Sequence, residues 1–284
     1  MKTTVLLYYK YVAVAEPEAE HQAQRTLCAE LGLLGRILIG DEGINGTVAG
    51  PKEATDAYIA AMNTHQLFSG IDYKVDTTDT NPFPRLRIKV RPEIVSLGVA
   101  VDPAMSAPKL TPAEFHAKLS DPNVVVFDAR NNYESAIGRF EGAVTPDVKL
   151  FKDLPAALGQ YEDLKDKTVL TYCTGGIRCE KASALMRQRG FKDVYQLDGG
   201  IIKYAQEFPD GQYKGDCFVF DDRMAMSFKE NPELLGVCIG CDSPTNDYYN
   251  CALPPCNALI LVCEDCALPG KTCSATCATA FATA

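Results

Sequence analysis

The chain has 284 residues, a hydrophobic fraction of 46% and a formal net charge of −9 at pH 7. That length predicts roughly two to three domains, and the acidic balance excludes a protein that coats nucleic acid through an overall positive charge. No stretch reaches the roughly 18 consecutive apolar residues of a membrane helix, and the N-terminus lacks a signal-peptide layout. We therefore expect a cytoplasmic protein with no membrane partner; the sequence indicates no particular protein partner.

Residues 1–97 show the alternation of an α/β domain. Strands are expected at 5–9, 35–39 and 46–50, helices at 18–33 and 53–62, and a last strand within 84–91. The order β-α-β-β-α-β is that of a ferredoxin-like, or acylphosphatase-like, sandwich. Residues 41–46 are expected to form a tight hairpin turn between the two middle strands. The alternative is that this turn presents Asn45 to a ligand.

The last of these strands alternates cations with apolar residues. In such a strand Leu86, Ile88 and Val90 face the core. The cations share the opposite face: Arg85, Arg87, Lys89 and Arg91. Neighbouring like charges repel each other unless an anion meets them, so one interpretation is a contact with an RNA backbone. The other is a solvated outer face.

A linker at 98–108 precedes a second α/β domain, predicted at 109–212. Thr111 fits a helix N-cap, with Pro112 at the first helical position and Glu114 at the third. Three apolar runs are expected to be buried parallel strands that carry functional residues at their carboxyl ends. They begin at residues 124, 168 and 194. This domain should be a doubly wound α/β structure.

The strand at 168–172 leads directly into the loop Cys173-Thr174-Gly175-Gly176-Ile177-Arg178, and a helical pattern follows. Gly175 and Gly176 let the loop curl so that backbone N–H groups point at the sulfur. Those amides, the positive end of the helix and Arg178 favour a thiolate over a thiol. We predict that Cys173 is a catalytic nucleophile with a lowered pKa. The alternative is a buried structural cysteine.

Several segments, in order, resemble the signatures of a rhodanese domain. They are residues 127–130, 133–134, 138–143, the Cys173 loop and residues 197–201. The resemblance implies that Cys173 carries a transient persulfide and that its six-residue loop suits sulfur rather than phosphate. Asp128 and Arg130 are expected to brace this loop. The usual Gly-His-Ile appears here as Gly-Arg-Phe at 138–140, so the histidine has no counterpart.

Cys179 lies six residues after Cys173, on the expected helix. It is a candidate resolving thiol, which would form a disulfide with an oxidised Cys173. The alternative is a buried helix position with no chemical role.

The region at 213–284 is rich in cysteine, and eight of the twelve cysteines of the chain lie after residue 237, in four closely spaced pairs. The pairs are Cys238 and Cys241, Cys251 and Cys256, Cys263 and Cys266, and Cys273 and Cys277. Each spacing lets two sulfurs reach one ion, and two pairs complete a four-thiolate zinc site. We expect two structural zinc ions, held by either interleaved or consecutive pairs. The alternative is a set of reduced structural thiols.

Over nearly its whole length the sequence is similar to the oxygen-dependent tRNA uridine hydroxylase family. The similarity rests on residues 35–47, on the motif Cys-Thr-Gly-Gly-Ile-Arg-Cys and on the cysteine-rich tail. It implies a tRNA-modifying oxidoreductase of the monooxygenase type, which converts the wobble uridine at tRNA position 34 to 5-hydroxyuridine. The partner would be tRNA and the co-substrate O2, with an electron donor that the sequence does not indicate. In this interpretation Cys173 reacts as a thiolate or a persulfide.

Two other functions are kept as alternatives. The first is a sulfurtransferase that takes sulfur from thiosulfate or a persulfide donor. The second is an RNA-binding zinc adaptor in which the rhodanese-like fold is only a scaffold; the intact Cys173 disfavours it.

Overall fold

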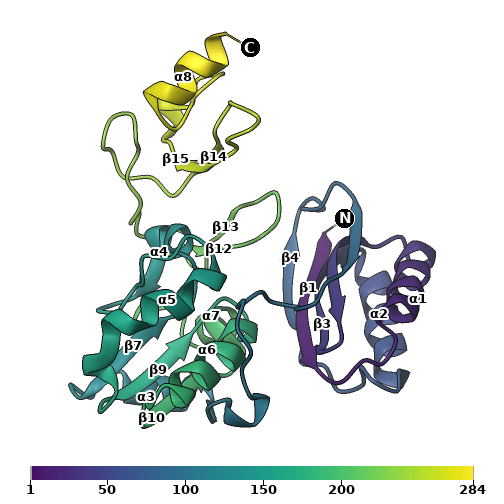
Figure 1. Ribbon diagram of the computed structural model, residues 1–284. Helices are drawn as coiled ribbons and strands as arrows, with labels where there is room; N and C mark the ends of the chain where they lie inside the picture. The colour runs from purple at the N-terminus through teal and green to yellow at the C-terminus, as the bar shows by residue number, and fades with distance from the viewer. Residues whose placement is uncertain (1, 284) are drawn as a thin grey trace.

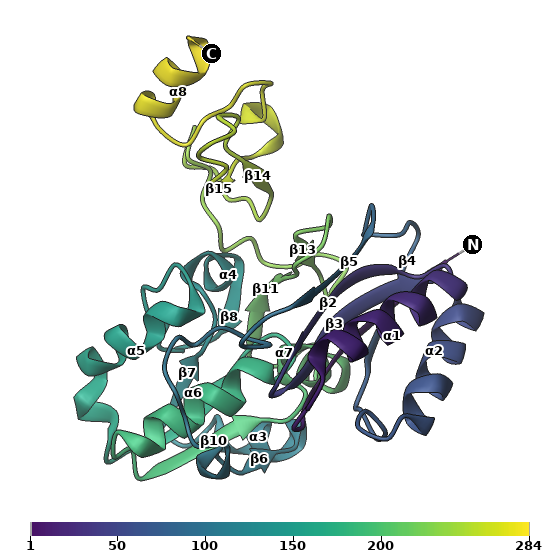
Figure 2. The same cartoon turned by 45° about the vertical axis from the view of Figure 1, so that its right-hand side comes forward.

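A computed structural model describes residues 2–283 in three parts (Figure 1). An N-terminal α/β domain lies beside a central α/β domain, and a small cysteine-rich region extends from the central domain (Figure 2). The predicted fold class, a ferredoxin-like domain followed by a parallel-sheet domain and a cysteine-rich end, is confirmed. Within residues 2–283, no helix has both the length and the apolar character needed to span a membrane.

The N-terminal domain is a five-stranded sheet with two helices on one face. Its elements are β1 (Thr3–Tyr11), α1 (Pro17–Glu30), β2 (Leu34–Gly40), β3 (Gly43–Gly50), α2 (Lys52–Thr64), β4 (Lys74–Thr78) and β5 (Leu86–Val90). Alternation along β1 buries Leu6 and Tyr8 under the helices, and it places Leu7 and Tyr9 on the opposite, helix-free face. That open face is directed toward the central domain (Figure 1).

The basic strand occupies a different place from the one predicted. The sheet order is β4-β1-β3-β2-β5, so β5 is a fifth strand, parallel to β2 at one edge. The strand that completes the ferredoxin-like order is β4, which pairs with β1 and was not predicted. Its sequence, KVDTT, is short and mostly polar, so it lacks the apolar alternation that marks a strand. The hairpin turn is present, and Asn45 donates from Nδ2 to the Ile94 carbonyl at 2.9 Å.

The central domain is built on four parallel strands in the order β6-β10-β9-β7. Its main elements are β6 (Lys109–Leu110), α3 (Pro112–Lys118), β7 (Val124–Asp128), α4 (Asn132–Ile137), β8 (Gly138–Phe140), α5 (Leu154–Ala157), β9 (Thr168–Tyr172), α6 (Ile177–Gln188), β10 (Asp193–Leu197), α7 (Gly200–Glu207) and β11 (Tyr213–Gly215). Short 3-10 segments lie at Pro103–Met105, Phe151–Asp153 and Leu158–Leu164. The predicted cap begins α3, since Thr111 Oγ1 accepts from the Glu114 N–H at 3.3 Å. Buried β9 carries the chain to Cys173.

The cysteine-rich region contains little regular structure. Its elements are the β12 (Cys217–Phe218) and β13 (Ala225–Met226) hairpin, the β14 (Tyr248–Asn250) and β15 (Leu259–Leu261) hairpin, a 3-10 turn at Glu264–Cys266 and α8 (Ala275–Ala282). Tyr248 joins this region to α4, because its hydroxyl donates to the Tyr133 carbonyl at 2.5 Å. Phe218, Ile137 and Tyr248 form a small apolar cluster at this junction.

Candidate active site

The Cys173 loop lies between the carboxyl end of β9 and the first turn of α6. Cys173 is only 1% exposed. The Gly176 N–H donates to the Cys173 Sγ at 3.1 Å. Gly176 has a φ of +102°, a backbone conformation that favours glycine. The loop therefore curls around the sulfur and directs a backbone donor at it.

The surroundings of Cys173 favour its charged form. Burial raises the pKa of a thiol, but a hydrogen bond from Cys179, the charge of Arg178 and the backbone N–H groups of Arg178 and Cys179 outweigh that effect and lower the pKa of Cys173 to about 6. Burial and the neighbouring Cys173 sulfur raise the pKa of Cys179 well above its ordinary value. At neutral pH the pair is thus a thiolate at Cys173 and a thiol at Cys179.

The guanidinium of Arg178 is held by the carboxylate of Glu134, a residue that was not predicted to be functional. Its Nη1 donates to Glu134 Oε1 at 2.5 Å and its Nη2 to Glu134 Oε2 at 2.7 Å, and Nη2 also reaches Thr174 Oγ1 at 3.3 Å. Glu134 is fully buried and Arg178 is 6% exposed. A bidentate pair fixes the plane of a guanidinium, so Arg178 acts on Cys173 through a positioned charge and through its backbone N–H. The only sequence signal for Glu134 was its place in the rhodanese-like signature.

Asp128 and Arg130 form a second ion pair, with both side chains fully buried. Arg130 Nε donates to Asp128 Oδ1 at 2.9 Å, and Nη2 donates to Asp128 Oδ2 at 2.6 Å. The Tyr172 hydroxyl donates to the same Oδ2 at 2.7 Å, and Arg130 Nη2 also binds the Gly138 carbonyl at 2.6 Å. These contacts tie the end of β9, one residue before Cys173, to β7 and β8.

Strand β1 of the N-terminal domain lies against the Cys173 loop. A Cβ on Gly175 would come within 2.8 Å of the Leu7 Cδ2, so a larger residue there would displace the Leu7 side chain. The Tyr9 hydroxyl donates to Glu180 Oε1 at 3.2 Å, just beyond the loop. Cys173 is therefore buried where the two domains are in close contact. The sequence did not predict this contact.

A charged cluster fastens the two domains beside this contact. Lys181 Nζ lies 2.8 Å from Glu42 Oε1 and 2.7 Å from Glu93 Oε1, and it donates to the Val95 carbonyl at 3.0 Å. Lys181 is on α6, whereas its partners are on the β2–β3 turn and on the chain after β5. A cleft of about 1060 Å³ adjoins the cluster and is lined by residues of both domains.

The cations of the basic strand are exposed at the sheet edge, and the structure adds a fifth. Arg36 on β2 stands beside Arg87 in register, and it is exposed too. The same register continues through Thr47 on β3 to Leu7 on β1, all on one face. Neighbouring strands are about 4.8 Å apart, so this row spans about 14 Å from the edge to the strand that covers the Cys173 loop. Arg36 was missed because its place depends on strand register.

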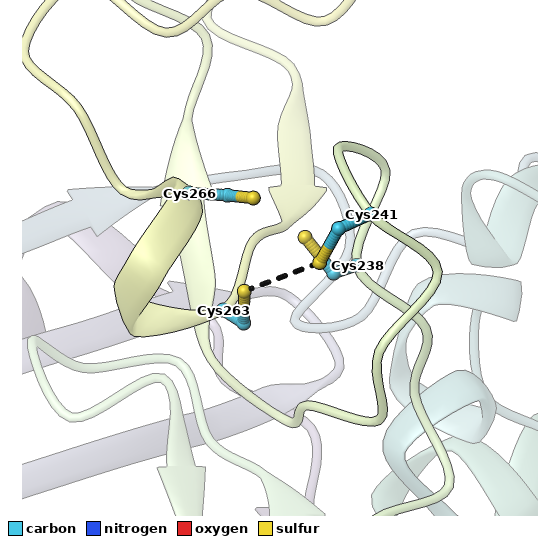
Figure 3. Close-up of side chains that lie close together, drawn as sticks. All are labelled: Cys238, Cys241, Cys263 and Cys266. Atoms are coloured by element: carbon cyan, nitrogen blue, oxygen red, sulfur yellow. Dashed lines mark hydrogen bonds between the residues drawn. The ribbon is translucent and has the colours of Figure 1, made fainter.

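The eight paired cysteines of the C-terminal region form two groups, and these are the only candidate metal-ligand clusters in residues 2–283. One group is Cys238, Cys241, Cys263 and Cys266 (Figure 3), and the other is Cys251, Cys256, Cys273 and Cys277. In each group the sulfurs lie within 4.8 Å of one another. Cys241 Sγ and Cys263 Sγ are 3.6 Å apart, close to the edge of about 3.8 Å expected for a tetrahedral zinc–thiolate site. The pairs combine in the interleaved order, and both groups fit a metal ion.

The buried strand, the six-residue cysteine loop and the following helix define a rhodanese-like domain. Residues 111–207 match the family described as the rhodanese-like domain. Residues 3–94 match the UPF0176 acylphosphatase like domain, and residues 214–278 match the rhodanase C-terminal family.

Curated relatives match nearly the whole chain. The tRNA uridine(34) hydroxylase of Pseudarthrobacter chlorophenolicus is 44% identical over 283 residues, which cover 94% of this chain and 95% of that protein. The enzyme of the same name from Cytophaga hutchinsonii is 43% identical over 265 residues, covering 92% and 85%. Among solved structures, the rhodanese-like domain of the Anabaena sp. Alr3790 protein has 22% identity and a TM-score of 0.33, covering 38% of this chain and 79% of that one. The chain belongs to the tRNA uridine(34) hydroxylase family, as the sequence motifs predicted.

The lowered pKa of Cys173 sets the pH at which its sulfur reacts. Alkylation of Cys173 by iodoacetamide, followed on its peptide by mass spectrometry, should accelerate with rising pH through a midpoint near 6, because only the thiolate is nucleophilic. Arg178→Gln combined with Glu134→Gln should move the midpoint upward, since the pair loses its cation without leaving a buried unpaired charge. Cys28, whose pKa burial raises to about 12, is the internal control. A wild-type midpoint near 9, the ordinary thiol value, would contradict the prediction.

Proposed function

We propose that this protein hydroxylates the wobble uridine of tRNA, at position 34, to 5-hydroxyuridine. The observation that carries the proposal is identity of 44% to a tRNA uridine(34) hydroxylase across 94% of the chain. The Cys173 site supports it with a thiol whose pKa is lowered to about 6, so that it is a nucleophile at neutral pH. Since tRNA is the substrate, we place the reaction in the cytoplasm.

We further propose that Cys173 is the reactive residue, as a thiolate or a persulfide, with O2 as co-substrate. The loop amides and Arg178 hold negative charge at the sulfur, and Glu134 keeps Arg178 in place. We also propose that Cys179, which lowers the pKa of Cys173, resolves an oxidised Cys173 as a disulfide. Asp128 and Arg130 act as a brace at the end of β9, without a chemical step of their own.

Nucleoside analysis of cellular tRNA tests the proposed function. Cells that lack this protein should lose 5-hydroxyuridine and the nucleosides derived from it, in a strain with no second route to them. Wild-type protein should restore them, whereas Cys173→Ala should not. Unchanged levels in the deletion strain would rule the proposed function out. If those levels are unchanged and the purified protein still turns over thiosulfate, the sulfurtransferase alternative is favoured.

We propose that the exposed cations Arg85, Arg87, Lys89 and Arg91, together with Arg36, bind the phosphate backbone of tRNA. They lie on one sheet edge and face, and their row ends at the strand that covers the Cys173 loop. Each phosphate contact contributes a slope of about −0.7 to −0.9 in a plot of log affinity against log salt concentration.

Charge reversal tests this surface. Arg87→Glu with Lys89→Glu should weaken tRNA binding and reduce the salt slope by between one and two. The matched control is Arg25→Glu with Lys52→Glu, which changes the same charge on α1 and α2, over the opposite face of the sheet. Equal tRNA affinities for the two variants would remove the basic strand from the proposal.

We propose that the two cysteine groups each hold one structural zinc ion. A closed site of four thiolates leaves no open position for substrate, and the region has few large apolar residues with which to fold alone. Backbone donors support the charged ligands, as the Gly240 N–H contacts Cys238 Sγ at 3.3 Å and the Cys273 N–H contacts Cys251 Sγ at 3.4 Å.

Metal analysis tests the zinc proposal. The purified chain should contain about two zinc ions, and Cys241→Ser with Cys266→Ser should reduce the content to about one, because each group binds independently. Cys28→Ser, outside both groups, should leave the content at two. Protein that folds and is purified without zinc would refute the proposal.

A further inference from the structure

A phenylalanine in the short loop between β12 and β13 lies beside the Cys173 loop. Phe220 is 49% exposed, although it follows two buried residues, Phe218 and Val219. Single exposed apolar side chains are common on proteins and alone carry no inference. The position of this one is unusual, because its ring contacts the residues that surround the reactive sulfur.

The ring of Phe220 is in contact with the guanidinium that acts on Cys173. Arg178 Cζ lies over the Phe220 ring, 5.7 Å from its centre. Phe218 packs edge-on against the same ring at 5.2 Å, with an angle of 76° between the planes. Phe220, Leu7 and Thr174, the residue that follows Cys173, line a common small pocket. A planar group stacked on this ring would therefore lie next to the reactive loop.

The loop that carries Phe220 is anchored to the N-terminal domain and is held by an ion pair of its own. Arg223 Nη1 lies 2.6 Å from Asp76 Oδ2 of β4, and Arg223 Nη2 lies 2.7 Å from Asp221 Oδ2. The Asp222 N–H donates to the Pro82 carbonyl at 3.0 Å. The β12–β13 hairpin thus reaches toward the N-terminal sheet (Figure 1). These bonds hold Phe220 at the boundary between the two domains despite its exposure.

The chemistry of the ring limits what it binds. Phe220 offers a π face and no hydrogen-bonding group, so it suits the flat face of a base rather than a phosphate or a charged side chain. Enzymes that act on a nucleic-acid base take it out of the stack and hold it against aromatic side chains. Exposed Arg36 and Arg87 lie in the same row of the sheet as Thr47, which lines the Phe220 pocket. A nucleotide whose backbone follows that row would bring its base to Phe220.

We propose that Phe220 is the stacking platform for the uracil of nucleotide 34, and that it holds the base against the Cys173 loop. This inference rests on the proposed function and adds a substrate-binding residue to it. The pocket has a volume of about 60 Å³, well below the roughly 300 Å³ at the lower end for ligand sites. The base therefore enters when the wall formed by Leu7 moves away from Phe220 and Thr174.

Binding of anticodon stem-loops tests the stack directly. One RNA has uridine at position 34, and the other has an abasic nucleotide there with the same backbone. Phe220→Ala should bind the uridine RNA about tenfold more weakly than wild type, and it should bind the abasic RNA as wild type does. Phe220→Tyr should restore the affinity, since it keeps the π face. Phe281→Ala is the matched control, because Phe281 is 41% exposed on α8, at the far end of the cysteine-rich region.

A second reporter uses the absence of tryptophan from the chain. Phe220→Trp introduces a single indole, whose fluorescence should be quenched by the uridine RNA and much less by the abasic RNA. The inference is overturned if Phe220→Ala binds the uridine RNA as tightly as wild type, or if it loses affinity equally for both RNAs, as a purely structural residue would. The same wild-type preparation is also assayed for hydroxylation of the uridine RNA. This assay tests the proposed function separately from the stacking of the base on Phe220. Base-dependent binding without hydroxylation contradicts the proposed function and leaves the stack standing.

Discussion

A charged sulfur inside a protein requires compensation, because removing an anion from water costs far more than burying a neutral thiol. Around Cys173 that compensation comes from groups that act on the sulfur and from other groups that hold them in place. The loop amides and the Arg178 charge act on the sulfur, and Glu134 holds Arg178 through two hydrogen bonds. The helix that carries Glu134 is contacted by Tyr248 of the cysteine-rich region, through the Tyr133 carbonyl. The charge state of one sulfur thus depends on groups from distant parts of the chain.

The same requirement connects the N-terminal domain to the site. Excluding water strengthens the electrostatic interactions at Cys173, and β1 does so by placing Leu7 against Gly175. In this closed arrangement Cys173 is only 1% exposed, so a tRNA base does not reach the sulfur. The exposed cations Arg36 and Arg87 lie on the same sheet that packs against the Cys173 loop.

Local sequence spacing was enough to predict the parts of the site that are close together in the chain. The Cys173 loop sits between its strand and helix, and the cysteine pairs needed only short turns. Glu134 was not recognised as functional, because its role depends on contact with a residue 44 positions away. The Tyr9–Glu180 contact spans 171 positions and depends on how two domains meet. The place of Arg36 beside Arg87 depends on strand register. Strand β4 was not predicted because its sequence is mostly polar.

The central claim is that the Cys173 sulfur is the reactive group in hydroxylation of uridine 34. The most direct measurement is the incorporation of ¹⁸O from labelled O2 into uridine 34 of purified tRNA, with a chemical reductant present. Wild-type protein should give labelled 5-hydroxyuridine, and Cys173→Ala should give none while it binds tRNA with unchanged affinity. Label incorporated by Cys173→Ala at the wild-type rate would contradict the claim.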